Sequence, residues 1–79
     1  MKGVWVNMIE MEIIETLAEI GGKKKLRRVA WNKREPKLDL RAWHEGDDGN
    51  EKPGKGLTLT DDEGRALMEA LQAYLNGRA

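Results

Sequence analysis

The chain has 79 residues, with 14 basic and 14 acidic side chains, one histidine and no cysteine. This length allows one small domain, near the size at which a single hydrophobic core is only marginally stable, so we expect oligomerisation. The lack of cysteine excludes disulfides and thiolate metal sites and fits a cytoplasmic protein. The apolar run from Val4 to Ile14 is interrupted by polar residues, so we expect neither a signal peptide nor a membrane span.

The charges are sorted along the chain. Residues 21–43 carry nine Lys or Arg and two acids, a local charge of +7, whereas residues 1–20 sum to −3 and residues 44–79 to −4. A basic block on a folded surface attracts polyanions through its local field, whatever the net charge. The alternative is a solvated charged face without a partner.

The first predicted element is a strand over residues 11–20, rich in apolar residues and ended by Gly21-Gly22, although Leu17, Ala18 and the glutamates also allow a helix. Residues 1–10 either lengthen this strand or form an N-terminal extension, and residues 11–79 form a single domain. A second strand is predicted over residues 26–33, with Arg27, Val29 and Trp31 on one face. Pro36 makes residues 33–36 the connecting loop.

A third strand over residues 37–44 has the clearest alternation, with Leu38, Leu40 and Ala42 on one face and Lys37, Asp39, Arg41 and Trp43 on the other. Residues 45–55 are rich in Gly, Pro and acids and predict a long loop. A short fourth strand follows over residues 57–59.

A C-terminal helix is predicted to begin after Thr60, because Thr60 and Glu63 have the spacing of a capping box. It shows one apolar stripe and ends at Gly77. The fold class is therefore α+β, a four-stranded antiparallel sheet followed by one amphipathic helix that covers the Leu38 and Leu40 face and leaves the other face open. The stripe exceeds what one sheet covers, and its surplus fits an isologous dimer through Leu67, Met68, Leu71, Tyr74 and Leu75.

Two tryptophans framed by cations indicate binding of single-stranded nucleic acid, because bases stack on the rings while the cations hold phosphates. Trp43 is expected to be exposed on the face away from the helix, where the alternative is a dimer-interface or sheet-edge position. Trp31 could face either the nucleic acid or the core. Five cations in the six positions from Lys23 to Arg28 are expected to contact the backbone with Lys33, Arg34 and Lys37.

From about Met11 to Leu75 the chain resembles the positive cofactor four family of transcriptional coactivators, and most closely its bacterial YdbC-like branch. The resemblance rests on Val29-Ala-Trp31-Asn32, on Pro36-Lys-Leu-Asp-Leu-Arg41 with Trp43, and on Glu51-Lys-Pro-Gly-Lys-Gly-Leu-Thr-Leu-Thr60 before the helix. It implies a curved four-stranded antiparallel sheet, a homodimer formed largely through the helices, and binding of single-stranded DNA along the concave sheet faces.

In that resemblance Trp43 matches the family's aromatic residue at the end of the third strand. Lys52 and Lys55 match the lysines of its Lys-Pro-Gly loop, and Trp31 matches a second aromatic position. The serine- and acid-rich regulatory arm of the eukaryotic coactivators is missing, so control by phosphorylation and contact with activators are not carried over.

Two enzymatic interpretations are weaker. Gly49 to Lys55 has the spacing of a P-loop, but Gly56 stands where a magnesium-binding Ser or Thr is needed and no helix follows. His44 with Glu45, Asp47 and Asp48 suggests a metal-dependent nuclease, yet one histidine and clustered carboxylates on a flexible loop offer no fixed ligand geometry. We therefore expect no enzyme activity, no catalytic residue, no metal and no cofactor.

The sequence thus predicts a cytoplasmic, homodimeric protein that binds single-stranded DNA, with RNA as an alternative ligand, with little sequence preference in transcription, replication or repair. The alternative is a protein-interaction module that uses the exposed Trp and Arg face. The residues expected to bind nucleic acid are Lys25, Arg27, Trp31, Lys33, Arg34, Lys37, Arg41, Trp43, Lys52 and Lys55.

Overall fold

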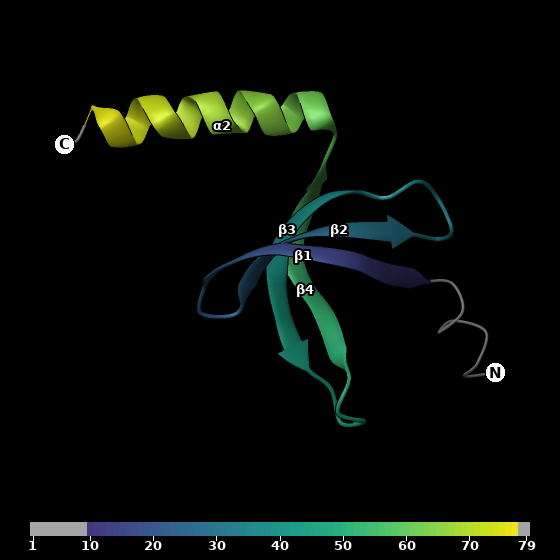
Figure 1. Ribbon diagram of the computed structural model, residues 1–79. Helices are drawn as coiled ribbons and strands as arrows, with labels where there is room; N and C mark the ends of the chain where they lie inside the picture. The colour runs from purple at the N-terminus through teal and green to yellow at the C-terminus, as the bar shows by residue number, and fades with distance from the viewer. Residues whose placement is uncertain (1–9, 78–79) are drawn as a thin grey trace.

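The computed structural model describes residues 10–77, which form one antiparallel sheet followed by one helix (Figure 1). The strands β1 (Met11–Gly21), β2 (Lys24–Trp31), β3 (Lys37–Glu45) and β4 (Glu51–Leu59) lie side by side in chain order. The helix α2 (Asp61–Asn76) follows β4 directly. The predicted α+β class is confirmed, and residues 11–20 are strand rather than helix. The prediction for the N-terminal extension lies, apart from its last residue, outside the described part of the chain.

The two turns that flank β2 explain its boundaries. Gly22 has a φ of 57° between β1 and β2, a left-handed conformation that glycine adopts without strain. Asn32 and Lys33 have φ values of 52° and 65°, and the amide of Arg34 donates to the carbonyl of Trp31 over 2.9 Å. The second strand therefore ends at Trp31, and the prediction that it continues to Lys33 is wrong.

The fourth strand is much longer than predicted, because residues 51–55 belong to β4 and not to a loop. Pro53 pairs with Trp43 in a strand at the edge of the sheet, where a residue without an N–H is tolerated. Gly56 faces Arg41 so closely that a Cβ atom there would overlap the Cβ atom of Arg41. Proline and glycine thus allow this strand instead of interrupting it.

The helix α2 has the predicted N-terminus. Thr60 accepts a hydrogen bond from the amide of Glu63 over 3.1 Å, and the Glu63 carboxylate accepts one from the amide of Thr60 over 2.8 Å. Asp61 and Asp62 lie in the first turn, where their charges complement the helix dipole. The helix ends at Gly77, as the sequence predicts.

The buried side chains lie mainly on the face of the sheet that was expected to be open. Val29 and Asp39 are fully buried, Trp43 is 2% exposed and Arg27 is 5% exposed. The register places Arg27 opposite Asp39, so these side chains share one face. We call this the polar face, defined by Lys25, Arg27, Trp31, Asp39, Arg41 and Trp43.

The helix α2 covers little of the opposite face. None of its residues is buried, and it projects beyond the sheet (Figure 1). The radius of gyration is accordingly 14.9 Å, above the roughly 12 Å expected for a compact chain of this length. The helix therefore covers Leu38 and Leu40 only partially. Leucines of the helix and of the sheet stay accessible in the space between the two.

Candidate nucleic-acid interface

One end of the polar face is organised around the buried carboxylate of Asp39. Arg41 donates to both of its oxygens, over 2.5 and 2.9 Å. The indole N–H of Trp31 donates to Asp39 over 3.2 Å, and the hydroxyl of Thr58 does so over 3.1 Å. The guanidinium of Arg41 lies over the Trp31 ring, 5.0 Å from its centroid. Asp39 therefore fixes the cation and the aromatic ring relative to each other.

The other end has a second arginine and tryptophan pair. The Arg27 guanidinium lies 4.6 Å from the centroid of the Trp43 ring, and its Nε donates to the Thr16 hydroxyl over 3.0 Å. Among the described residues, neither Nη1 of Arg27 nor Nε1 of Trp43 has a hydrogen-bond partner, although both atoms are buried. Within residues 10–77, this end therefore has two buried donors without acceptors, and such donors cost free energy.

Glu51 links this second pair to Lys25. One carboxylate oxygen lies 2.7 Å from Nζ of Lys25 and the other lies 2.8 Å from Nη2 of Arg27. Hydrogen bonds from Lys25 and then from Arg27 hold the pKa of Glu51 below its ordinary value. Glu51 thus stays ionised down to lower pH than a free glutamate and neutralises part of the basic surface.

Trp31 and Trp43 each border a hollow in the surface. Trp31 lines one of about 250 Å³ with Arg34, Glu35, Lys37 and Thr58. Trp43 lines a larger one of about 440 Å³, together with Lys23, Lys25, His44 and Glu51 among others. Cations border both hollows, and Arg27, Asp39 and Arg41 lie along the face between the two tryptophans.

The polar face therefore gathers half of the residues predicted to bind nucleic acid: Lys25, Arg27, Trp31, Arg41 and Trp43. Arg34 and Lys37 adjoin it at the hollow beside Trp31. The others lie elsewhere. Lys33 sits in the turn after β2, 3.9 Å from a carboxylate oxygen of Glu10. Lys52 and Lys55 lie on β4 with exposed side chains, and Lys52 lies 3.1 Å from Asp48.

The expectation that Trp43 is exposed is wrong. At 2% exposure its ring lies under Arg27 and belongs to the core. The open Trp and Arg surface is therefore smaller than expected, because Trp43 does not belong to it, and the interaction-module alternative stays a prediction. Trp31 is half-buried on the polar face, and its contact with nucleic acid stays a prediction.

Sequence reasoning missed Glu51, Thr16 and Thr58 as partners of the basic residues. Each is separated from its arginine, lysine or aspartate partner by 11 to 26 positions, so only the strand register brings them together. The prediction of a loop over residues 45–55 also kept Glu51 from being placed beside the strand residues Lys25 and Arg27.

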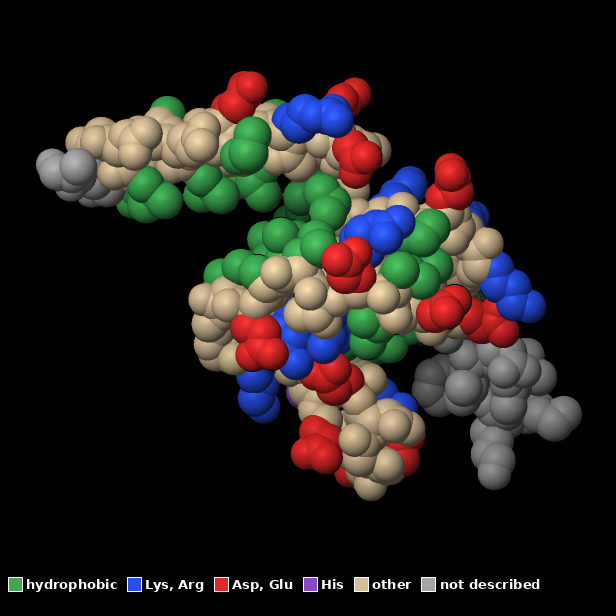
Figure 2. Space-filling view, in the orientation of Figure 1, with side chains coloured by type: hydrophobic (Ala, Val, Ile, Leu, Met, Phe, Trp, Pro, Cys, Tyr) green, Lys and Arg blue, Asp and Glu red, His purple; other side chains and the backbone are tan. Residues whose placement is uncertain are grey.

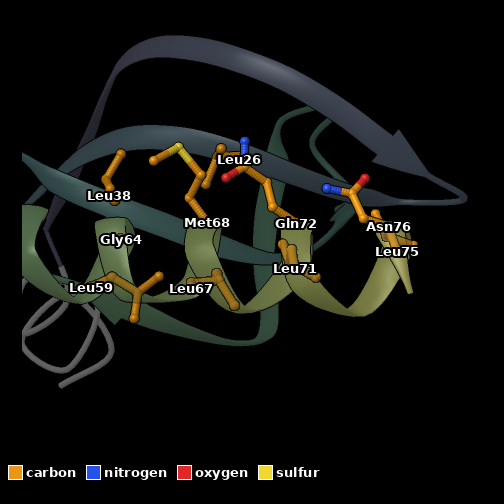
Figure 3. A pocket seen from close by; sticks show the side chains of 10 residues that line it. All are labelled: Leu26, Leu38, Leu59, Gly64, Leu67, Met68, Leu71, Gln72, Leu75 and Asn76. Carbon is orange, nitrogen blue, oxygen red and sulfur yellow. The ribbon is translucent and has the colours of Figure 1, made fainter. Parts of the chain in front are cut away.

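A groove between α2 and the sheet contains most of the predicted dimer residues (Figure 3). It has a volume of about 350 Å³ and is lined by Leu67, Met68, Leu71 and Leu75 of the helix and by Leu26, Leu38 and Leu59 of the sheet, with Gly64, Gln72 and Asn76. Met68 is 52% exposed and Leu75 is 60% exposed. Figure 2 shows the apolar side chains along the side of α2 that faces the sheet. Tyr74 lies outside the groove and is 55% exposed.

The predicted nuclease residues do not form a metal site. Within residues 10–77, no three His, Asp or Glu side chains are arranged to hold a metal ion. The amide of Asn50 and the Lys52 side chain hydrogen-bond to the Asp48 carboxylate and lower its pKa. The described part of the chain also has no helix long and apolar enough to cross a membrane.

The profile of the family described as Transcriptional Coactivator p15 (PC4) matches residues 18–70, which include the end of β1, the strands β2, β3 and β4, and most of the helix. The chain belongs to this family. The predicted family resemblance is thereby confirmed, while assignment to the bacterial branch stays a prediction. Membership supports nucleic-acid binding and a coactivator-like role in transcription for this PC4-family protein. No curated protein matches the chain.

Proposed function

We propose that this protein binds single-stranded DNA on its polar face, with little sequence preference, as an accessory factor in transcription, replication or repair and without chemistry of its own. The observation that carries the proposal is the pair of arginine and tryptophan stacks, 4.6 and 5.0 Å from guanidinium to ring, at the two ends of one face. Cations along such a track bind the sugar-phosphate backbone, and aromatic rings accept any base by stacking.

Trp31 and Trp43 have different roles in this proposal. Trp31 borders an open hollow with Arg34 and Lys37, so its ring and these cations are within reach of one base and its phosphate. Trp43 lies beneath Arg27, and a base reaches its ring only after the guanidinium has moved. We assign the first stacking contact to Trp31 and a supporting role under Arg27 to Trp43.

The proposed active form is a homodimer that closes the groove beside α2. Leu67, Met68, Leu71, Tyr74 and Leu75 are each between 37% and 60% exposed in the single chain. Apolar surface of this extent on one helix favours burial against a second copy. A dimer would also bring two polar faces to one nucleic-acid strand.

The test is fluorescence anisotropy of labelled single-stranded and duplex oligonucleotides, with protein tryptophan emission recorded in parallel. We expect tighter binding to the single strand, quenching of tryptophan, and an affinity that falls with salt by about 0.7 log units per log unit of salt for each phosphate neutralised. Equal or tighter binding to duplex, or no binding at low salt, would rule out the proposal.

The variant Trp31→Ala tests the stacking contact. Its affinity for oligo-dT should fall by about 1–3 kcal/mol, as for other base-stacking aromatics. The salt slope should stay the same, because no phosphate contact is lost. Trp31→Phe keeps a ring and should retain most of the affinity, so equal losses in both variants would argue against stacking.

A further inference from the structure

Glu51 holds the position on the polar face that suits a phosphate. Its two oxygens contact two different cations, Nζ of Lys25 at 2.7 Å and Nη2 of Arg27 at 2.8 Å. Two non-bridging oxygens of a phosphodiester can accept hydrogen bonds from a lysine and an arginine in the same way. The carboxylate therefore resembles the ligand that the proposed function requires.

Accessibility shows which partner is outermost. The side chain of Glu51 is 38% exposed, whereas those of Lys25 and Arg27 are 20% and 6% exposed. A phosphate arriving from solvent thus meets the carboxylate before it meets the cations. In the free protein these two cations are neutralised by a residue of the same chain.

Arg27 does not depend on Glu51 alone for its position. Arg27 is also held by Thr16 at 3.0 Å and by the ring of Trp43 beneath it. Its Nη1 atom, in a side chain more than nine-tenths buried, has no acceptor among the described residues, and neither has Nε1 of Trp43. Donors that are pre-positioned and incompletely satisfied suit an incoming group with several acceptor oxygens.

We propose that Lys25 and Arg27 form a subsite for a backbone phosphate of the nucleic-acid strand, and that Glu51 occupies this subsite in the free protein and is displaced on binding. The inference rests on the proposed function, since the ligand is the same strand. Glu51 is the first residue of β4 and follows a loop that contains Gly49, so its side chain can turn to solvent while the strand stays paired. A ligand then binds this subsite well only when it contacts both Lys25 and Arg27, as the Glu51 carboxylate does.

The test compares Glu51→Gln with the wild type in oligo-dT binding over a range of salt concentrations. Removing the competing charge should tighten binding about three- to tenfold at low salt, because the phosphate no longer competes with a carboxylate for the two cations, and the slope of log K against log salt should stay the same, because the same phosphates are neutralised. Circular dichroism checks that the variant is folded.

Glu45→Gln is the matched control, because Glu45 pairs with Glu51 across the strands but forms no ion pair with Lys25 or Arg27. Its affinity for oligo-dT should rise less than about twofold, which is the effect of the change in net charge alone. Equal gains in both variants, or weaker binding by Glu51→Gln, would overturn the inference. Competition by millimolar inorganic phosphate beyond its ionic-strength effect would assign the subsite to a free anion and overturn it too.

The wild-type protein provides a second readout that does not depend on folding of the variant. The carboxyl carbon resonance of Glu51 should shift when oligo-dT saturates the protein, because its two cation partners are replaced by water. A resonance unchanged at saturation would contradict displacement. If neither the wild type nor the variant binds oligonucleotide, the proposed function itself fails, whereas wild-type binding without a gain in Glu51→Gln refutes the subsite alone.

Discussion

At the scale of single residues, the polar face owes its order to two charged side chains inside the sheet. Asp39 is fully buried and accepts hydrogen bonds from Arg41, Trp31 and Thr58. Arg27 is packed on Trp43 and held by Thr16 and Glu51. Buried charges of this kind are tolerated because each has several partners, and removing one partner leaves the other uncompensated.

We expect Asp39→Asn to lower the free energy of unfolding by about 3 kcal/mol, because the Arg41 guanidinium would lose its buried counter-charge. The matched control is Asp62→Asn. Asp62 also pairs with an arginine, at 2.6 Å, but its side chain is 93% exposed, and its loss should lower stability much less than that of Asp39. Urea unfolding measures both. Equal effects of the two substitutions would show that Asp39 has no special structural role.

Trp43→Ala should destabilise the protein by about 3–5 kcal/mol, the usual cost of removing a large aromatic from a core. Leu57→Ala serves as the comparison, because Leu57 is 49% exposed. It should cost much less. A Trp43 variant as stable as the Leu57 variant would mean that Trp43 is not a core residue in solution. Binding losses in Trp43→Ala have to be corrected for this loss of folded protein.

At the scale of elements, the sequence predicts what depends on local patterns. The alternation in residues 37–44, the Gly21-Gly22 turn and the capping box at Thr60 each specify their element through neighbouring residues, and all three are present. β4 was underestimated because Pro53 and Gly56 normally mark loops. Their fitness for a strand depends on the sheet edge and on the close approach of Arg41, which are properties of the assembled sheet.

The candidate site also depends partly on local sequence patterns and partly on the assembled sheet. Alternation along β2 and β3 placed Arg27, Trp31, Arg41 and Trp43 on one face, as the register confirms. It did not reveal that Trp43 is buried, because burial depends on Arg27 folding over its ring from the neighbouring strand. Nor did it reveal Glu51, whose partners lie 24 and 26 residues away in sequence.

The helix α2 contacts the sheet only lightly, so its stability depends strongly on its own sequence signals. Isolated helices of this length are marginal in water. We expect Thr60→Ala to cost about 1 kcal/mol, because the hydroxyl acceptor of the capping box is lost. Thr60→Ser keeps that acceptor and should be close to wild type. Thermal unfolding followed at the helix band of circular dichroism distinguishes them, and identical curves for Ala and Ser would contradict a role for the cap.

At the scale of the whole molecule, polar and apolar surfaces are segregated. Lys25, Arg27, Arg41 and both described tryptophans lie on one face of the sheet, and the exposed Leu67, Leu71 and Leu75 of α2 line the groove against its other face. This separation fits a protein that uses one side for a polyanion and the other for self-association.

Leu71→Glu should convert the proposed dimer into a monomer, because it places a charge in the apolar groove. Ala66→Glu adds the same charge to α2 outside the groove and should leave the dimer intact. Sedimentation equilibrium gives the mass of each. A wild type that is monomeric at high protein concentration, or a dimer that survives Leu71→Glu, would contradict this assembly.

The central claim is that nucleic acid binds on the polar face, and its most direct test is a nuclear magnetic resonance titration of the labelled protein with oligo-dT. We predict that the largest shifts fall on Lys25, Arg27, Trp31 and Arg41, including the indole N–H of Trp31, with little change in α2. Shifts confined to the leucine-lined groove, or an unperturbed polar face at saturating oligonucleotide, would contradict the claim.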